Sequence, residues 1–143
     1  MNTFGELTAL IPALKNDTFG RWIVDKENDG SPQHPIRMPF VAYSPAVYQL
    51  IETLYGFCDA HPEFEHTRYG ETLKKHGLEW GAESMENADV SHADAKLVIA
   101  LLIGALRADR FCEGALLVFC ENGSIVRWLE RLEAIDGEHH RNT

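Results

Sequence analysis

The spacing of hydrophobic residues changes twice along the chain. Before residue 15 and after residue 44 they recur mainly every three or four residues, which is the spacing of one helical face. Between these points lie two short apolar runs, Trp22–Val24 and Ile36–Tyr43, separated by the polar, turn-rich segment Asp25–Pro32. We expect two short strands there, with Pro39 restricting the second to an edge or a bulge. The pattern predicts a mainly α fold, a compact helical bundle of about five helices with a small β-hairpin near the N-terminus.

Capping signals place the first two helices. Thr3 and Glu6 have the spacing of a capping box, and Pro12 is expected to end or kink the helix that follows them. Ser44-Pro45 combines a cap residue with proline at the first helical position. A second helix is therefore predicted from this point to about Ala60.

Further signals delimit the middle of the chain. Thr67 can cap a short helix, and Gly77 stands where a left-handed C-terminal residue is expected. Ser91 and Asp94 precede the most apolar segment, Ala95–Phe111. A helix that is apolar on nearly all sides belongs in the middle of a domain, so this segment is predicted to form the centre of the bundle. Gly114 is expected to mark the end of this helix or a break in it.

The C-terminal third is predicted to contain two more helical segments. One covers Ala115–Phe119, and the next follows the stop signal Asn122-Gly123 with Ser124 as its cap. Its apolar stripe consists of Ile125, Trp128, Leu129, Leu132 and Ile135, while Arg127, Glu130, Arg131 and Glu133 are expected to face outward. Gly137 is expected to end this helix, giving a single domain over residues 1–137 and a disordered tail over 138–143.

Composition and charge exclude several classes of function. The 143 residues carry a net charge of −9, which opposes direct binding to nucleic acid or to an anionic membrane. The longest apolar run, residues 97–106, is half the length of a membrane span. With no signal-peptide pattern and three cysteines that lack CxxC spacing, we expect a cytoplasmic protein without disulfides.

No metal or cofactor is expected from the motifs. Asp25–Gly30 resembles the start of a calcium-binding loop, but Ile36 stands where the bidentate glutamate is required. The seven histidines show no HxxxH spacing, and phosphate-binding and nucleophile-elbow motifs are absent from the sequence. The segment from Asp25 is interpreted as a solvated turn.

The candidate site is a cluster of charges at the end of the most apolar segment. Arg107 and Arg110 share a helical face, and Arg110 is also correctly spaced to pair with Glu113. Two interpretations remain open: the arginines pair with Asp109, Glu113 or other acids to fix helix packing, or they line a cleft and bind an anion. In the second case Glu113 is a candidate acid or base and Cys112 a remote candidate nucleophile, although Cys112 is expected to be buried and inert.

A resemblance directs attention to the same segment. Residues 107–114, RADRFCEG, with Leu116, the Gly123-x-Ile125 element and the Leu129-x-Arg131-Leu132 element, resemble a bacterial domain-of-unknown-function family, number 6508, mainly over residues 91–135. Residues 38–45 are similar to the family as well, whereas Cys120 stands where phenylalanine is expected. The resemblance implies a small bacterial protein and supplies no chemistry.

Three functional hypotheses follow. The first is a cytoplasmic binding or regulatory module for a protein or small ligand, favoured because no catalytic motif is found in the sequence. The second is an enzyme or sensor for a small anionic ligand, using Arg107 and Arg110. The third, an acidic protein that mimics nucleic acid, requires acids gathered on one face, whereas they are spread along the whole chain.

Overall fold

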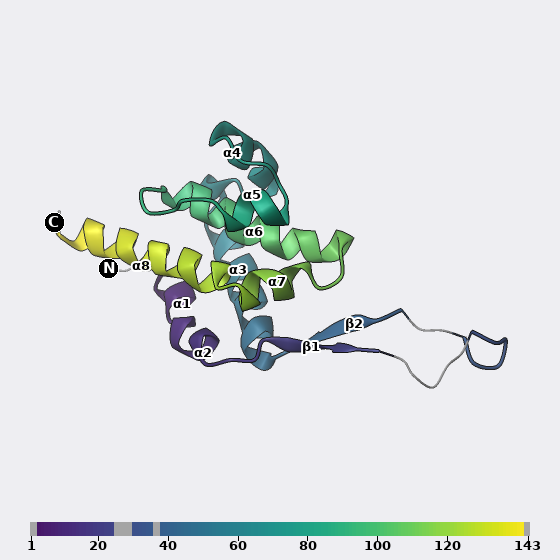
Figure 1. Ribbon diagram of the computed structural model, residues 1–143. Coiled ribbons are helices and arrows are strands. Elements are labelled where there is room, and N and C mark those ends of the chain that lie inside the picture. Colours follow the sequence, from purple (N-terminus) through teal and green to yellow (C-terminus); the bar gives the residue numbers. More distant parts are fainter. Residues whose placement is uncertain (1–2, 25–29, 36–37, 142–143) are drawn as a thin grey trace.

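The computed structural model describes residues 3–24, 30–35 and 38–141, and it is built mainly from helices (Figure 1). Its helices are α1 (Gly5–Thr8), α2 (Ile11–Lys15), α3 (Pro45–Ala60), α4 (Tyr69–Lys75), α5 (Ala82–Glu86), α6 (Ala95–Phe111), α7 (Ala115–Glu121) and α8 (Ser124–Arg141), with the 3-10 turns η1 (Pro62–Phe64) and η2 (His66–Arg68). The strands are β1 (Gly20–Ile23) and β2 (Phe40–Tyr43). The expected mainly α fold with an N-terminal hairpin is confirmed.

Helix α6 occupies the centre of the molecule. Every residue from Leu97 to Leu106 is buried, because α4 packs on one side of α6 while α7 and α8 pack on another (Figure 1). These residues join one hydrophobic cluster that extends from Phe4 to Ile135. The prediction that the most apolar segment is a central helix is therefore confirmed. In the described part of the chain no helix is long and apolar enough to cross a membrane.

The longest predicted helices begin and pack as expected. Ser44 Oγ accepts a hydrogen bond from Val47 N at 3.3 Å, so α3 begins with the predicted cap. All five residues of the predicted stripe of α8 are buried. Arg131 departs from the expected outward position because its side chain lies against the loop before α6, where Nε donates to Ala93 O at 2.9 Å.

The N-terminus differs from its prediction. The backbone N–H groups of Thr3 and Phe4 each donate to the Asp136 carboxylate at 3.0 Å, so a side chain from α8 replaces the expected capping box. Pro12 lies in the first turn of α2 rather than ending a helix. Proline is tolerated there because the first N–H groups of a helix have no intrahelical partner.

Other predicted helix ends were partly wrong. Thr67 lies in η2, and α4 begins two residues later without a side-chain cap. Asp94 alone caps α6, through Leu97 N at 2.9 Å, while Ser91 bonds to Asp89. Gly77 is confirmed as the left-handed residue after α4, with φ of 74°.

Helix α8 is longer than its pattern indicated. It begins at Ser124, which is therefore its first helical residue and not the cap, and it continues past Gly137 to Arg141. The expected boundary at Gly137 was too early, because glycine at an exposed position near a helix end is only mildly unfavourable. Residues 142–143 lie outside the described part of the chain.

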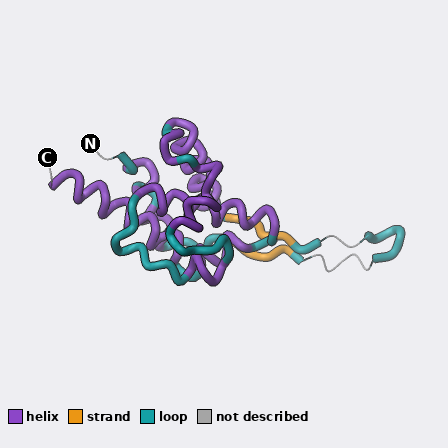
Figure 2. Tube along the Cα trace, turned by 90° about the horizontal axis from the view of Figure 1, so that it is seen from above, coloured by secondary structure: helices purple, strands orange, loops and turns teal. Residues whose placement is uncertain are grey.

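The strands form an antiparallel hairpin that leaves the helical body (Figures 1 and 2). We call β1, β2 and residues 30–35 and 38–39 the arm. Trp22 pairs with Val41 and Ile23 with Phe40, and Pro39 comes directly before β2. The calcium-loop resemblance at residues 25–29 and the expected strand residues 36–37 lie outside the described residues.

Candidate functional site

The predicted charge cluster lies where the arm meets the body. We call residues 107–117, together with Trp22 and Tyr43, the junction. Here α6 passes beyond the helices that cover it, turns at Gly114 and continues as α7. Side-chain burial changes sharply over the last residues of α6, since Leu106 is buried whereas Phe111 is 78% exposed. The end of α6 is therefore a surface feature, and its charges are not sealed in the core.

Asp109 organises the turn from α6 into α7. Its Oδ1 accepts hydrogen bonds from Tyr43 Oη at 2.7 Å and from the backbone N–H groups of Gly114 and Leu116, each at 3.1 Å. Tyr43 Oη in turn accepts from Leu117 N at 3.1 Å. Burial and the bond to Asp109 raise the pKa of Tyr43 above its usual range, so the phenol stays protonated and donates.

Glu113 and Gly114 attach the arm to this turn. Glu113 Oε1 accepts a hydrogen bond from Val41 N in β2 at 2.8 Å. Gly114 adopts φ of 87°, and a Cβ there would lie 2.3 Å from Trp22 Cζ2. The position requires glycine both for its backbone conformation and for the close approach of the indole. Asp109 and Glu113 thus both accept backbone hydrogen bonds, and both attach the arm to the body.

The two arginines remain without an acidic partner. Neither Arg107 nor Arg110 forms a hydrogen bond or ion pair with the residues that the structure describes, so the expected Arg110–Glu113 pair is wrong. Arg107 Cζ lies 5.8 Å from the centre of the Tyr55 ring, and its Nε is buried without a partner. Arg110 is exposed. Backbone N–H groups and the Tyr43 hydroxyl donate to Asp109 and Glu113 in place of the arginines.

The cysteines divide into two kinds. Cys112 directly follows α6 and is exposed, so the expectation of a buried thiol was wrong. Cys58 and Cys120 are buried, and burial raises their pKa values to about 11 and about 12. Among the residues with described side chains, no group of three or more His, Cys, Asp or Glu residues could hold a metal ion.

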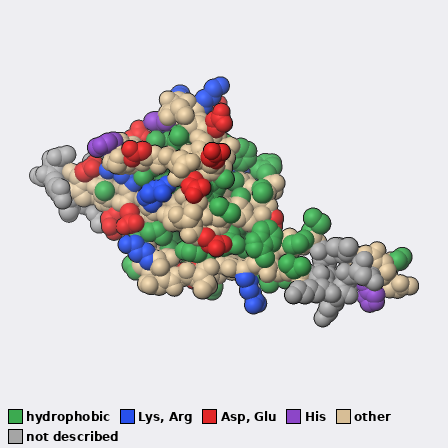
Figure 3. All heavy atoms as spheres, in the orientation of Figure 1, with side chains coloured by type: hydrophobic (Ala, Val, Ile, Leu, Met, Phe, Trp, Pro, Cys, Tyr) green, Lys and Arg blue, Asp and Glu red, His purple; other side chains and the backbone are tan. Residues whose placement is uncertain are grey.

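Apolar side chains are exposed on both sides of the junction. Phe111 meets Trp80 edge to face, with ring centres 5.5 Å apart, and Trp80 Nε1 donates to Gly104 O at 2.9 Å. On the arm, Phe40 is 49% and Met38 81% exposed. Figure 3 shows hydrophobic side chains gathered on the side of the body from which the arm leaves. Exposed apolar side chains therefore occur both at the end of α6 and on the arm.

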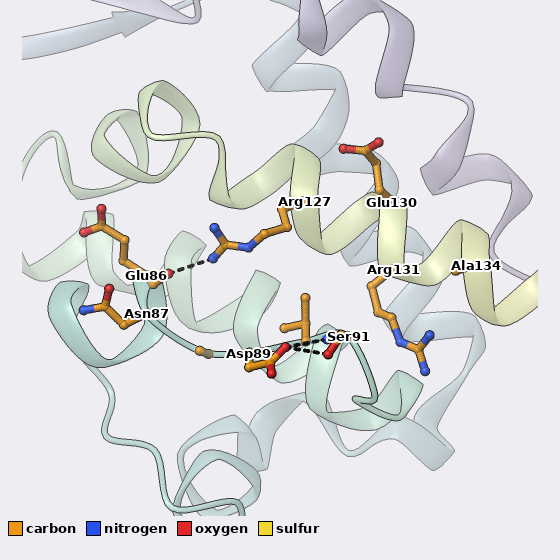
Figure 4. Close-up of a pocket in the computed structure, with 10 residues that line it drawn as sticks. Glu86, Asn87, Asp89, Ser91, Arg127, Glu130, Arg131 and Ala134 are labelled. Carbon is orange, nitrogen blue, oxygen red and sulfur yellow. Dashed lines mark hydrogen bonds between the residues drawn. The ribbon is translucent and has the colours of Figure 1, made fainter.

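A separate hollow of about 600 Å³ lies between α8 and the loop before α6 (Figure 4). Arg127 points toward the end of α5 and donates to Glu86 O at 2.7 Å, while Arg131 pairs with Glu138 at 3.0 Å in addition to its bond to Ala93 O in the loop. Asp89 accepts two hydrogen bonds from Ser91. The polar groups of this hollow thus hold the loop against α8, which makes it a weaker candidate for ligand binding than the junction.

Sequence reasoning located the cluster but missed the residues that organise it. Tyr43 and Val41 are separated from their partners Asp109 and Glu113 by 66 and 72 positions. Trp22 is farther still from Gly114. The sole local signal was Gly114 itself, which was expected to mark an end or a break of the helix and which has the positive φ of such a residue.

Comparison with known proteins identifies the family. The model of a family of unknown function, DUF6508, matches residues 2–138, and the chain belongs to this family. The match covers the arm, the helices α1 to α7 and α8 as far as residue 138, well beyond the C-terminal segment that carried the resemblance. No curated protein and no solved structure matches the chain.

Proposed function

We propose that this protein is a small bacterial, cytoplasmic binding module that recognises another protein, and that the arm and the junction form its recognition surface. The supporting observation is that exposed apolar side chains occur on both parts, chiefly Met38 and Phe40 on the arm and Phe111 on α6. Contiguous exposed apolar surface on a soluble domain marks interaction sites. The partner is a protein with a complementary apolar surface.

The physical properties of the arm support this proposal. A two-stranded hairpin is marginally stable in water, and the arm is anchored to the body near its base through Val41, Tyr43 and Trp22. The outer part carries Met38, an exposed apolar side chain beyond the paired strands. A partner that covered this surface would remove apolar area from water and stabilise the pairing of the strands.

The anchoring role of Glu113 favours binding over catalysis. A general acid or base must be positioned within hydrogen-bond reach of the proton that it transfers to or from a substrate. Glu113 instead accepts a hydrogen bond from the backbone of β2, and Asp109 accepts three others. The acids of the cluster thus maintain the recognition surface.

Site-specific crosslinking in the source bacterium tests the proposal. A photoreactive phenylalanine analogue at Met38 is expected to give one discrete crosslinked product, which mass spectrometry then identifies. The same analogue at Lys75, an exposed position on α4, serves as the control and is expected to give none. Phe40→Ser is expected to abolish the product while circular dichroism shows an unchanged helical content.

Two results would overturn the proposal. One is the absence of any product specific to the arm, and the other is a product whose yield is unaffected by Phe40→Ser. A product of twice the chain mass would identify a second copy of this protein as the partner and would support the proposal.

A second candidate function is an enzyme or sensor for a small anionic ligand. The observation that favours it is Arg107, whose buried Nε has no partner within the part of the chain that the structure describes. Arg110, three residues away on the same face, is a further cation without an acidic partner among the described residues. A thermal-shift assay with inorganic phosphate and with acetate tests this candidate, since a specific site predicts a shift that is lost in Arg107→Gln.

A further inference from the structure

We infer that the end of α6 is a docking site for an acidic, apolar peptide segment of the partner protein, with Arg107 and Arg110 binding its carboxylate and Phe111 and Trp80 packing on its apolar side chain. The inference rests on the protein-binding function proposed above and specifies the chemistry of the partner. We call Tyr55, Trp80, Arg107, Arg110 and Phe111 the arginine–aromatic surface.

The geometry brings a cation and aromatic rings together on one side of α6. Gly104, Arg107 and Phe111 are spaced by three and four residues, so they follow one another along the same side of the helix. Trp80 contacts both ends of this row, through Gly104 O and the Phe111 ring. Tyr55 lies on the α3 side of the row and faces the Arg107 guanidinium. Arg107 thus faces Tyr55 of α3 and lies between the two residues of α6 that Trp80 contacts.

The charges of this surface are complementary to a carboxylate. Arg107 and Arg110 have no acidic partner among the described residues, although the chain as a whole carries a net charge of −9. The two nearest acids in the sequence are bonded to Tyr43 and to backbone N–H groups. The Arg107 side chain is half-buried and Arg110 is exposed, so a docking carboxylate can accept hydrogen bonds from their guanidinium groups, which have no acidic partner among the described residues.

The residue types match the centre of a protein interface. Trp, Tyr and Arg are enriched at positions that contribute most to binding, and aromatic side chains lose little conformational freedom on docking. Phe111 is 78% and Trp80 41% exposed, so both have area left to bury. A phosphate polymer is disfavoured because the acidic body repels it at long range. A peptide with isolated acids among apolar residues fits both the exposed aromatic rings and the acidic body of the protein.

Selection from a library of displayed random peptides against the intact protein tests this inference. The selected peptides are expected to share an Asp or Glu next to aromatic or large aliphatic residues. Their affinities are then measured by fluorescence anisotropy. The double variant Arg107→Gln/Arg110→Gln is expected to weaken binding by at least about tenfold, as loss of a central interface charge does.

Three controls make the result specific. Lys74→Gln/Lys75→Gln removes the same formal charge from exposed positions on α4 and is expected to leave affinity unchanged. Replacing the peptide acid by its amide is expected to weaken binding as much as the arginine variant does. Phe111→Ser is expected to weaken peptide binding without changing the unfolding transition, because its ring is largely exposed.

Several outcomes would overturn the inference. These are failure to select any peptide, selection without enrichment of acids, equal binding by the arginine variant, and equal loss in the lysine control. Full competition by acetate or phosphate would assign the arginines to a small anion, and tighter binding of a labelled single-stranded oligonucleotide would assign them to nucleic acid. If the Met38 crosslink persists while peptide binding fails, protein recognition stands and only the proposed partner chemistry is lost.

Discussion

The two ends of α6 belong to one helix but lie in different environments. Leu97 to Leu106 are all buried, and the side chains of Leu101 and Leu102 are fully so. Within two turns the helix reaches Phe111, which is 78% exposed. The apolar pattern alone placed Phe111 with the core, whereas the structure places it on the surface beside Trp80.

The two ends of α6 therefore have different roles in the protein. Along the buried end, α4, α7 and α8 surround the helix, and its apolar side chains hold the bundle together. At the exposed end, Asp109 and Glu113 bind the arm and the turn into α7, while the Phe111 ring remains largely exposed. Apolar side chains therefore contribute to folding at the buried end of α6 and, on our proposal, to recognition at its exposed end.

The largest expected contrast is between Leu102→Ala and Phe111→Ala. Leu102 is fully buried, so its truncation leaves a cavity and should lower the free energy of unfolding by about 2–5 kcal/mol. Phe111→Ala should cost less than about 1 kcal/mol, since it loses one edge-to-face contact. Urea denaturation followed by circular dichroism measures both. Equal losses would show that the end of α6 is also part of the core.

The next effect concerns the close contact at the junction. Gly114→Ala should lower the free energy of unfolding by about 1–3 kcal/mol through its positive φ, and further because Trp22 must move. Gly123→Ala is the matched control, since Gly123 has φ of 83° but nothing within 4 Å of the added Cβ. The difference between the two losses measures the Trp22 contact. A red shift of tryptophan emission in Gly114→Ala alone is also expected.

A smaller effect is expected from the phenol that links β2 to α7. Tyr43→Phe removes one bond to Asp109 and one from Leu117 N, and should lower the free energy of unfolding by about 1–2 kcal/mol. Amide hydrogen exchange at Leu117 should accelerate. Tyr48→Phe, at an exposed ring nearby, is the control and should change neither quantity. Unchanged exchange at Leu117 in Tyr43→Phe would contradict the proposed link.

The smallest effect is a pH dependence of stability in the alkaline range. Burial raises the pKa of Cys58 to about 11 and of Cys120 to about 12, from an ordinary thiol value of 9.0. Below pH 9 both thiols are protonated in the folded and unfolded chains, so their stabilising effect is fully present. Above it the unfolded chain loses protons that the folded chain retains, so stability should fall as pH rises toward 11–12.

Alanine variants of the cysteines separate this effect from other titrations. Cys58→Ala/Cys120→Ala should show a shallower loss of stability above pH 9 than the natural chain, whatever its stability at neutral pH. Cys112→Ala should keep the natural slope because Cys112 is exposed. Guanidinium denaturation over a series of pH values measures these slopes, and identical slopes in all three proteins would refute the role of buried thiols.

Local signals predicted many helix boundaries because they act within a few residues. Ser44, Gly77 and Gly114 have the cap or positive φ that their types favour. The wrong predictions have distant causes. Thr3 was expected to begin a capping box, but Asp136 supplies the acceptors from the other end of the chain. Glu113 was expected to pair with Arg110 within one helical turn. It instead accepts a hydrogen bond from the backbone N–H of Val41 in β2.

By itself, the amino-acid sequence determined that this chain is mainly helical, that residues 97–106 form its centre, and that charges cluster where that helix ends, because period, capping and apolar content act locally. Only the tertiary structure decided that Asp109 and Glu113 anchor the arm while Arg107 and Arg110 remain free of acids among the described residues. Strand pairing and helix packing bring to Asp109 and Glu113 the groups that bind them, from residues more than 60 positions away. No spacing rule within one helix contains that information.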